Sequence, residues 1–489
     1  MEGFKGGLDA GLGLLINCGT GRAVQLLAHI LAAAFRNVVL NVRAHEIEHL
    51  TQQLRSQNSG RREEAARLLG LYAAVRPLYR TWIFREGAIP RLVPLLKSRN
   101  MRARLAAADA VRYLALDKDV RDEVVRAGAV PRLTRLLRRR YVYRLRISAV
   151  RALGTLAVGK ENVAVITGGA FVSEAVRTAK RLGNEVGGTL PGRHRNKATL
   201  LAAVLDLLAR LCEDTGATQE CRADGELLGV LCKLMLTNET EVVNSSLAFT
   251  LKLLDDGPDA LKTEVVAAGL VSKLLKTWQH ASGPSQTALQ VLIAVAEVPA
   301  NHGALREGAE KMRWVSRPSL LQLEECLDVQ REGCEMKQTG VLSFLACLCA
   351  NASVLTMLRK TAIVTTLTAR LNEQPRPCQA ALCQALAALC AKTEFRKHFE
   401  DDGTVPLLVE MLFSEEMEVV DSAVQALCRF ACSESSQMLI ATPKSLERLL
   451  ELQTSDNTSL VCGTLELLRQ LSQRLAVQEL LREVEIPVR

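Results

Sequence analysis

Two segments of this chain are nearly identical and lie one repeat length apart. Gly87-Ala88-Ile89-Pro90-Arg91-Leu92 and Gly128-Ala129-Val130-Pro131-Arg132-Leu133 share this pattern, and a weaker copy, Gly169-Ala170-Phe171-Val172, begins after the same interval. Internal periods of roughly 20 to 50 residues are typical of stacked units, because one such unit cannot bury its own apolar face. The spacing therefore predicts a stack of repeats instead of a single globular core.

Each repeat has the sequence signals of consecutive helices. A glycine readily adopts the left-handed conformation that ends a helix, and a proline three residues later fits the first turn of the next helix. Leucine pairs follow, and then come the Ala-rich stretches from Ala106 to Leu116 and from Ser148 to Val158. Aromatic residues make up only 4% of the chain, which favours closely packed helices over β-sheets.

The unit resembles the armadillo repeat, whose consensus has a Gly-Ala-Ile/Val-Pro start, a Leu-Val-x-Leu-Leu helix and a final Ala-x-x-Ala-Leu-x-Asn-Leu-Ala helix. The resemblance extends over about residues 45–485, with further copies starting near Gly225, Gly269, Gly308, Thr361, Gly403 and Thr442. It implies an all-α fold, an armadillo-type α-solenoid in which about ten three-helix repeats form a right-handed superhelix. It also implies a non-enzymatic scaffold or adaptor for protein–protein interaction, without catalytic residues, metal or cofactor.

Charge divides the expected solenoid. Residues 1–200 contain 35 Lys and Arg against 15 Asp and Glu, whereas the rest of the chain contains 27 against 38. We predict regular, basic repeats over 45–181 and a Gly-rich, basic loop over 182–197. Divergent, acidic repeats should follow over 198–489, with an insertion near 313–338. The strong basic excess favours an acidic partner for the first part.

Residues 1–44 are apolar and poor in acidic residues, and we predict N-terminal capping helices or a targeting segment there. Residues 8–42 leave open a mitochondrial presequence or membrane association, although Gln25, His29 and Arg36 interrupt the apolar run that a spanning helix needs. Thirteen of the 14 cysteines follow residue 200, and none forms a CxxC pair. This usage favours free thiols in a reducing, cytoplasmic setting.

Arginines recur at equivalent positions, where the third helix of each repeat should begin. Arg62, Arg104 and Arg146 are evenly spaced by one repeat length, and Arg102 and Arg144 repeat the same step. Equivalent positions of a solenoid form a column along one face. The partner-binding hypothesis comprises this column and its neighbours, namely Arg61, Arg62, Arg102, Arg104, Arg138, Arg139, Arg140, Tyr141, Tyr143, Arg144 and Arg146.

An arginine column can bind the carboxylates or phosphates of an acidic peptide, a phosphorylated protein or an anionic lipid, and the alternative is a solvated basic edge. Nucleic acid is disfavoured, because few aromatic residues are available to stack on bases. The resemblance also implies an Asn in the third helices that holds a peptide backbone. The matching positions here carry none, since they are Leu71, Tyr113, Thr155, Cys347, Ala388, Arg429 and Gln470.

The segment His45-Glu46-Ile47-Glu48-His49 matches the His-Glu-x-x-His pattern of zinc proteases. In that pattern, two histidines on one helix face bind the metal. Here Glu48 places a charge where such motifs have an uncharged residue, and the segment aligns with a repeat helix. We therefore interpret it as a solvated helix start.

Overall fold

The structure is a computed structural model, and every regular element that it describes is a helix. The described residues are 44–474 apart from 139–140, 169–170, 188–194, 238, 280–284, 313–314, 329–334, 350, 359–360, 362, 364–365, 368–375 and 456. The chain forms two compact units, one of Met1–Ala175 with Arg195–Thr218 and one of Val176–His194 with Gln219–Arg489.

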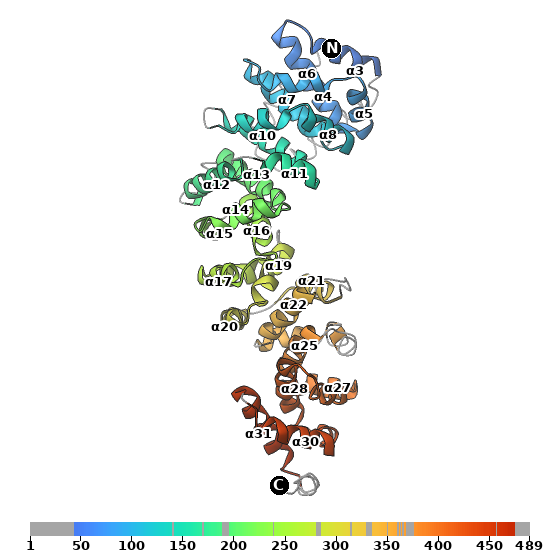
Figure 1. The fold of residues 1–489 in the computed structure, drawn as a ribbon, viewed down its shortest axis with the longest axis vertical. Helices are drawn as coiled ribbons and strands as arrows, with labels where there is room; N and C mark the ends of the chain where they lie inside the picture. The colour runs from blue at the N-terminus through green and yellow to red at the C-terminus, as the bar shows by residue number, and fades with distance from the viewer. Residues whose placement is uncertain are drawn as a thin grey trace, which may run out of the picture. The chain divides into compact units, whose positions relative to one another are not determined.

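The first unit is built around four long third helices, α4 (Ser59–Val75), α7 (Met101–Leu114), α10 (Tyr143–Leu156) and α13 (Arg195–Leu211). Each packs against the next along the chain, as the blue to green part of Figure 1 shows. The shorter helices of this unit are α3 (Ala44–Gln53), α5 (Pro77–Arg85), α6 (Ile89–Leu95), α8 (Lys118–Arg126), α9 (Ala129–Leu136) and α11 (Lys160–Thr167). Two helices cross the unit boundary, α12 (Phe171–Gly187) and α14 (Thr215–Ala223).

The second unit repeats this arrangement, and its third helices also pack in sequence. They are α16 (Thr240–Leu254), α19 (Ser285–Ala296), α22 (Glu335–Leu348), α25 (Arg376–Leu389), α28 (Met417–Phe430) and α31 (Thr458–Leu471). The others are α15 (Leu227–Met235), α17 (Asp259–Ala267), α18 (Val271–Gln279), η1 (Pro299–Asn301), α20 (His302–Glu310), α21 (Arg317–Asp328), α23 (Ala352–Leu358), α26 (Thr393–Asp401), α27 (Thr404–Met411), α29 (Glu434–Ile440) and α30 (Pro443–Leu452). The predicted all-α solenoid of three-helix repeats is confirmed.

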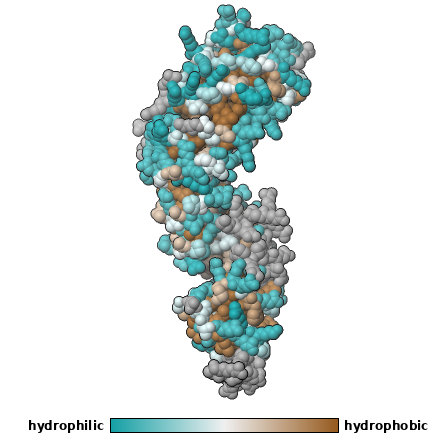
Figure 2. Space-filling model, viewed as in Figure 1, coloured by the Kyte–Doolittle hydropathy of each residue, from teal (hydrophilic) through white to brown (hydrophobic). Residues whose placement is uncertain are grey.

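The glycines end helices and the small residues allow close helix packing, as the sequence predicts. Gly87, Gly128, Gly269 and Gly403 have φ of 69°, 76°, 71° and 74°, the left-handed region in which glycine carries no side-chain penalty. Each ends a first helix directly before a second helix. Small residues bring third helices together, since a Cβ at Gly70 of α4 would lie 3.0 Å from the Ala110 Cα of α7. Figure 2 shows hydrophilic residues interspersed with hydrophobic patches over the visible face.

Three predicted boundaries differ from the structure. The loop expected at 182–197 is shorter, because α12 continues to Gly187 and α13 begins at Arg195. Leu182 and Val186 are buried, and Gly183 lies against Val230 of α15, so the apolar face extends the helix. The insertion expected near 313–338 contains α21, the second helix of its repeat, and the first residues of α22. The repeat start placed at Gly308 is wrong, because Gly308 lies inside α20.

The N-terminal prediction for 1–44 falls almost entirely outside the described residues, which begin with Ala44 in α3. Among the described residues, no single helix is long and apolar enough to span a membrane. One pair, Ser285–Ala296 with Pro299–Glu310, meets the length and composition criteria together but is bent by 113°.

Candidate functional site

The central arginine column of the first unit is turned toward the protein itself. Arg62 Nη1 donates to the carbonyl oxygens of Ser56 and Gln57 at 2.8 and 3.3 Å, and Arg146 Nε donates to that of Leu137 at 3.0 Å. These carbonyls follow second helices, where backbone oxygens lack helical partners. Arg146 is only 4% exposed. At Arg62 and Arg146, the recurring arginine therefore ties the start of a third helix to the preceding turn.

Two tyrosines predicted to contact a partner lie on these arginines instead. The Arg104 guanidinium carbon is 4.8 Å from the Tyr141 ring centroid, and that of Arg146 is 5.5 Å from the Tyr143 ring centroid. Both distances are typical of cation–π contacts, which stabilise a partly buried guanidinium. Arg146 is buried, and Arg62 and Arg104 have contacts within the chain, so partner binding by these three residues stays a prediction.

Neighbouring arginines remain available to a partner. Arg61, Arg102 and Arg144 lie in the first turns of α4, α7 and α10, and Arg138 follows α9; all four are exposed. We call these four residues the basic face. The other two predicted residues, Arg139 and Arg140, lie outside the described residues.

Asparagine caps position two residues of the basic face, Arg61 and Arg102. The Asn58 side chain accepts from the backbone N–H groups of Gly60 and Arg61, and Asn100 does the same for Arg102 and Ala103. Asn100 Nδ2 also donates to Glu63 Oε2 at 2.8 Å, which ties α7 to α4. The positive end of each helix dipole therefore lies beside an exposed arginine, and the first turns of α4, α7 and α10 contain no acidic residue. This arrangement favours an anionic ligand.

The zinc-protease pattern lies on α3, where His45 and His49 are both exposed. Ile47, between them, is fully buried and anchors the helix in the core. Within the described part of the chain, no group of three or more His, Cys, Asp or Glu side chains is arranged to hold a metal ion.

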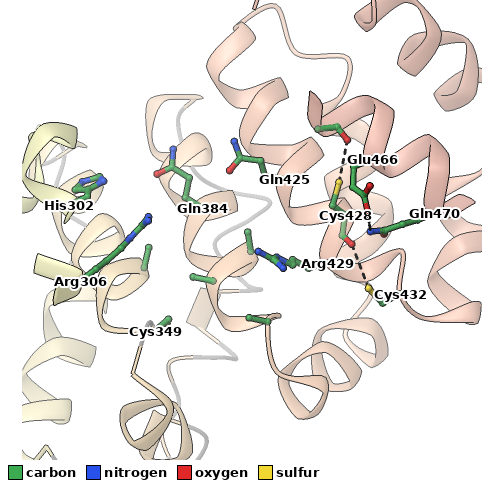
Figure 3. Close-up of a pocket in the computed structure, with 15 residues that line it drawn as sticks. His302, Arg306, Cys349, Gln384, Gln425, Cys428, Arg429, Cys432, Glu466 and Gln470 are labelled. Atoms are coloured by element: carbon green, nitrogen blue, oxygen red, sulfur yellow. Dashed lines mark hydrogen bonds between the residues drawn. The ribbon is translucent and has the colours of Figure 1, made fainter. Parts of the chain in front are cut away.

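The second unit contains a hollow of about 780 Å³ along its third helices, which we call the groove. Small residues line it, four from α22, α25 and α31 and one from the turn after α25, namely Ala346, Ala387, Ala388, Gly463 and Ala391. Polar side chains rise beside them from α20, α25, α28 and α31, as Figure 3 shows for His302, Arg306, Gln384, Gln425, Arg429, Glu466 and Gln470.

One charge of the groove is neutralised internally. Arg469 donates to both carboxylate oxygens of Glu466 at 2.6 and 2.8 Å, and Gln470 Nε2 donates at 2.8 Å. These hydrogen bonds lower the pKa of Glu466 to about 2. Glu466 is therefore ionised at neutral pH, but its charge is matched by Arg469.

Two thiols of the groove, Cys349 and Cys428, have raised pKa values and are protonated at neutral pH. Burial raises the pKa of Cys428 to about 11, and the nearby Glu466 adds to the effect. Burial also raises the pKa of Cys349. Cys428 Sγ lies 3.4 Å from the Gly463 carbonyl oxygen, so it joins α28 to α31. These groups serve packing rather than nucleophilic chemistry.

Sequence reasoning missed the groove, although a signal was present. Gln384, Gln425 and Glu466 are evenly spaced by one repeat length, as are Ala388, Arg429 and Gln470. The second set lies where the resemblance implies an Asn, and the first set lies one helical turn earlier.

Comparison with known proteins supports the fold. Residues 77–116, which contain α5, α6 and α7, match the Armadillo/beta-catenin-like repeat family. No curated protein matches the chain in sequence. An engineered protein of known crystal structure is 22% identical, with 88% of this chain and 99% of that one covered and a TM-score of 0.53. A structure from work on a phosphorylation switch that controls the interaction between cadherin and beta-catenin is 17% identical, with 96% and 93% covered and a TM-score of 0.56.

Proposed function

Because this chain is an armadillo-repeat α-solenoid, a fold typical of protein-interaction scaffolds, we propose that it is an adaptor whose basic first unit binds an acidic or phosphorylated partner. The basic face carries this proposal. Three of its four exposed arginines lie at the positive ends of three successive third helices. Guanidinium groups pair readily with carboxylates and phosphates, often through two parallel hydrogen bonds.

The wider charge distribution agrees with this proposal. Residues 1–200 contain 20 more basic than acidic residues. An excess of this size attracts anionic partners and speeds their association at low salt. For beta-catenin, which has a similar fold, a phosphorylation switch controls the interaction with cadherin. At 17% identity this likeness concerns the fold, so the acidic nature of the ligand is argued from the arginines alone.

We also propose that the protein acts in the cytoplasm. Cys349, Cys383 and Cys390 are free thiols buried within the second unit. Buried free thiols suit a reducing compartment. Membrane or mitochondrial association through residues 8–42 is a separate hypothesis from the sequence, which fractionation of the full chain against a chain starting at Arg43 would test.

Charge reversal on the basic face tests the proposed function. The variant R102E/R144E of the full chain should bind a short fluorescein-labelled Glu-Ser repeat peptide roughly tenfold more weakly than the unchanged protein. A control variant, K397E/K444E, makes the same change in net charge on exposed residues of α26 and α30. Equal affinities for the two variants would exclude the basic face as the binding surface.

A further inference from the structure

One turn of the second unit, between α27 and α28 (Figure 1), combines exposed apolar side chains with acidic ones. Phe413 lies two residues after the end of α27 and is 51% exposed, and Met417, the first residue of α28, is 41% exposed. The stretch from Glu410 to Glu418 contains four glutamates and no lysine or arginine. We call the six exposed residues of this turn the acidic edge, namely Glu410, Phe413, Glu415, Glu416, Met417 and Glu418.

Hydrogen bonds fix the backbone of the acidic edge. The N–H of Phe413 donates to the Glu410 carbonyl oxygen at 3.1 Å, and Arg448 Nε of α30 donates to that of Leu412 at 3.2 Å. The exposure of Phe413 therefore belongs to an ordered turn. Single exposed apolar residues are common on protein surfaces, but two in one turn that is otherwise acidic suggest a contact with another molecule.

The same turn of the first unit carries the opposite charge. Met101 and Met417 are each the first residue of a third helix, so Arg102 of the basic face and Glu418 of the acidic edge occupy equivalent positions. Residues 97–104, which match 413–420, contain four basic residues and no acidic one. Met101 is 44% exposed, so the basic turn also presents an apolar side chain among its charges. The two turns are complementary in charge and similar in apolar content.

Helix stability explains the acidic charges but not the basic ones. The N-terminal end of a helix is positive, so Glu418 in the first turn of α28 stabilises that helix. Arg102 and Arg144 lie in the first turns of α7 and α10, where their charges oppose the helix dipoles. Because these arginines weaken their own helices, a role in binding an acidic surface accounts for them better than a role in stability.

We propose that the acidic edge of one copy of this protein binds the basic face of a second copy. Phe413 and Met417 would pack against the exposed Met101, and the glutamates of the acidic edge would pair with Arg102 and Arg144. An apolar centre within a polar rim is the usual composition of a protein interface. This inference rests on the proposed function, because it names the acidic partner of the basic face.

The geometry of this contact predicts a particular kind of assembly. The two surfaces lie in different units, so the contact is heterologous, and each copy in a pair retains one surface for a further copy. Heterologous contacts produce closed rings or open filaments. The size of the assembly should therefore increase with protein concentration.

Sedimentation velocity of the full chain tests self-association directly. The unchanged protein should sediment faster as its concentration rises at low salt, and high salt should return it to the monomer because exposed ion pairs are screened. E416K/E418K should remain monomeric. The control E264K/E310K makes the same change in net charge on exposed residues of α17 and α20, and it should associate like the unchanged protein. F413S should weaken association several-fold.

An exchange of charges between two variants identifies the interface. R102E/R144E and E416K/E418K should each be monomeric alone, because each then carries like charges on both surfaces. A mixture of the two should associate again, since each surface of one variant then meets opposite charges on the other. Melting temperatures of the separate variants would show that both are folded.

The Glu-Ser repeat peptide separates this inference from the proposed function. E416K/E418K has an unchanged basic face, so it should still bind the peptide although it no longer self-associates. Equal peptide affinities of R102E/R144E and its control would contradict the proposed function itself. A monomeric unchanged protein that binds the peptide through the basic face would contradict only the self-association.

Three results would overturn the inference. The first is sedimentation of the unchanged protein that does not depend on its concentration at low salt. The second is association of a folded E416K/E418K protein that equals that of its control. The third is a mixture of the two charge-reversal variants that stays monomeric.

Discussion

The two units place their arginines differently, and the difference separates stability from binding. In the first unit, Arg62 and Arg146 recur at the start of third helices and bond to backbone carbonyls of the same repeat. Only their sequence neighbours, such as Arg102 and Arg144, face solvent. In the second unit, Arg429 lies near the end of a third helix and lines a groove together with small residues. Both kinds of arginine recur at the repeat interval, so burial and hydrogen bonding to backbone carbonyls mark the structural role, and exposure marks a candidate site.

The largest stability effect should come from a buried cation of the second unit. Lys262 is 4% exposed, and its Nζ lies 2.5 Å from Glu297 Oε2. Replacing Lys262 with Ala leaves the Glu297 carboxylate largely buried without the Lys262 ammonium, and we expect a loss of about 3–5 kcal/mol in unfolding free energy. Urea unfolding followed by circular dichroism would measure it. Replacing the exposed Lys276 of α18 with Ala is the control and should change little.

Replacing the buried cation of the first unit, Arg146, should lower the unfolding free energy by a smaller amount. Arg146→Ala removes the donor to the Leu137 carbonyl, and we expect a loss of about 1–3 kcal/mol. Arg144→Ala, two residues away and exposed, should leave stability unchanged but weaken peptide binding. If both variants had the same melting temperature, the structural role of the recurring arginine would be wrong.

The glycines that end first helices should have the same effect on stability in both units when they are replaced. A Cβ at Gly128 or Gly403 would meet no atom within 4 Å, so only the left-handed backbone opposes alanine. We expect Gly128→Ala and Gly403→Ala each to cost about 1–2 kcal/mol. Gly225 also has open space around it but does not have a positive φ, so Gly225→Ala should be neutral or stabilising. A clear difference between Gly128→Ala and Gly403→Ala would show that the two repeats are not equivalent.

The smallest effect concerns thiol reactivity. Since burial raises the pKa of Cys428 to about 11, its thiolate is scarce at neutral pH and grows about tenfold per pH unit up to that value. Alkylation of Cys428, followed by peptide mapping, should therefore be slow at pH 7 and rise steeply between pH 8 and 10. A rate that is independent of pH in this range would contradict the raised pKa.

The sequence predicted the fold well because its signals are local. Gly87, Gly128 and Gly403 end helices through backbone freedom that depends on no distant contact, and alanines at regular spacing specify close packing. Helix ends were less predictable. The glycines after Leu182 predicted a loop, but Leu182 and Val186 are buried against the neighbouring helices, and this packing keeps the segment helical to the end of α12. The candidate site was hard to predict for the same reason, because it also depends on tertiary contacts. Spacing showed that Arg62, Arg104 and Arg146 are equivalent, but the direction of a side chain depends on tertiary contacts such as the one with the Leu137 carbonyl.

The salt dependence of peptide binding tests the central claim most directly. The affinity of the full chain for the Glu-Ser repeat peptide would be measured from low to high NaCl, for the unchanged protein and for R102E/R144E. The account predicts a steep loss of affinity with salt, because exposed ion pairs are screened, and a clearly shallower dependence in the variant. An affinity that does not change with salt, or the same dependence in both proteins, would contradict binding by the basic face.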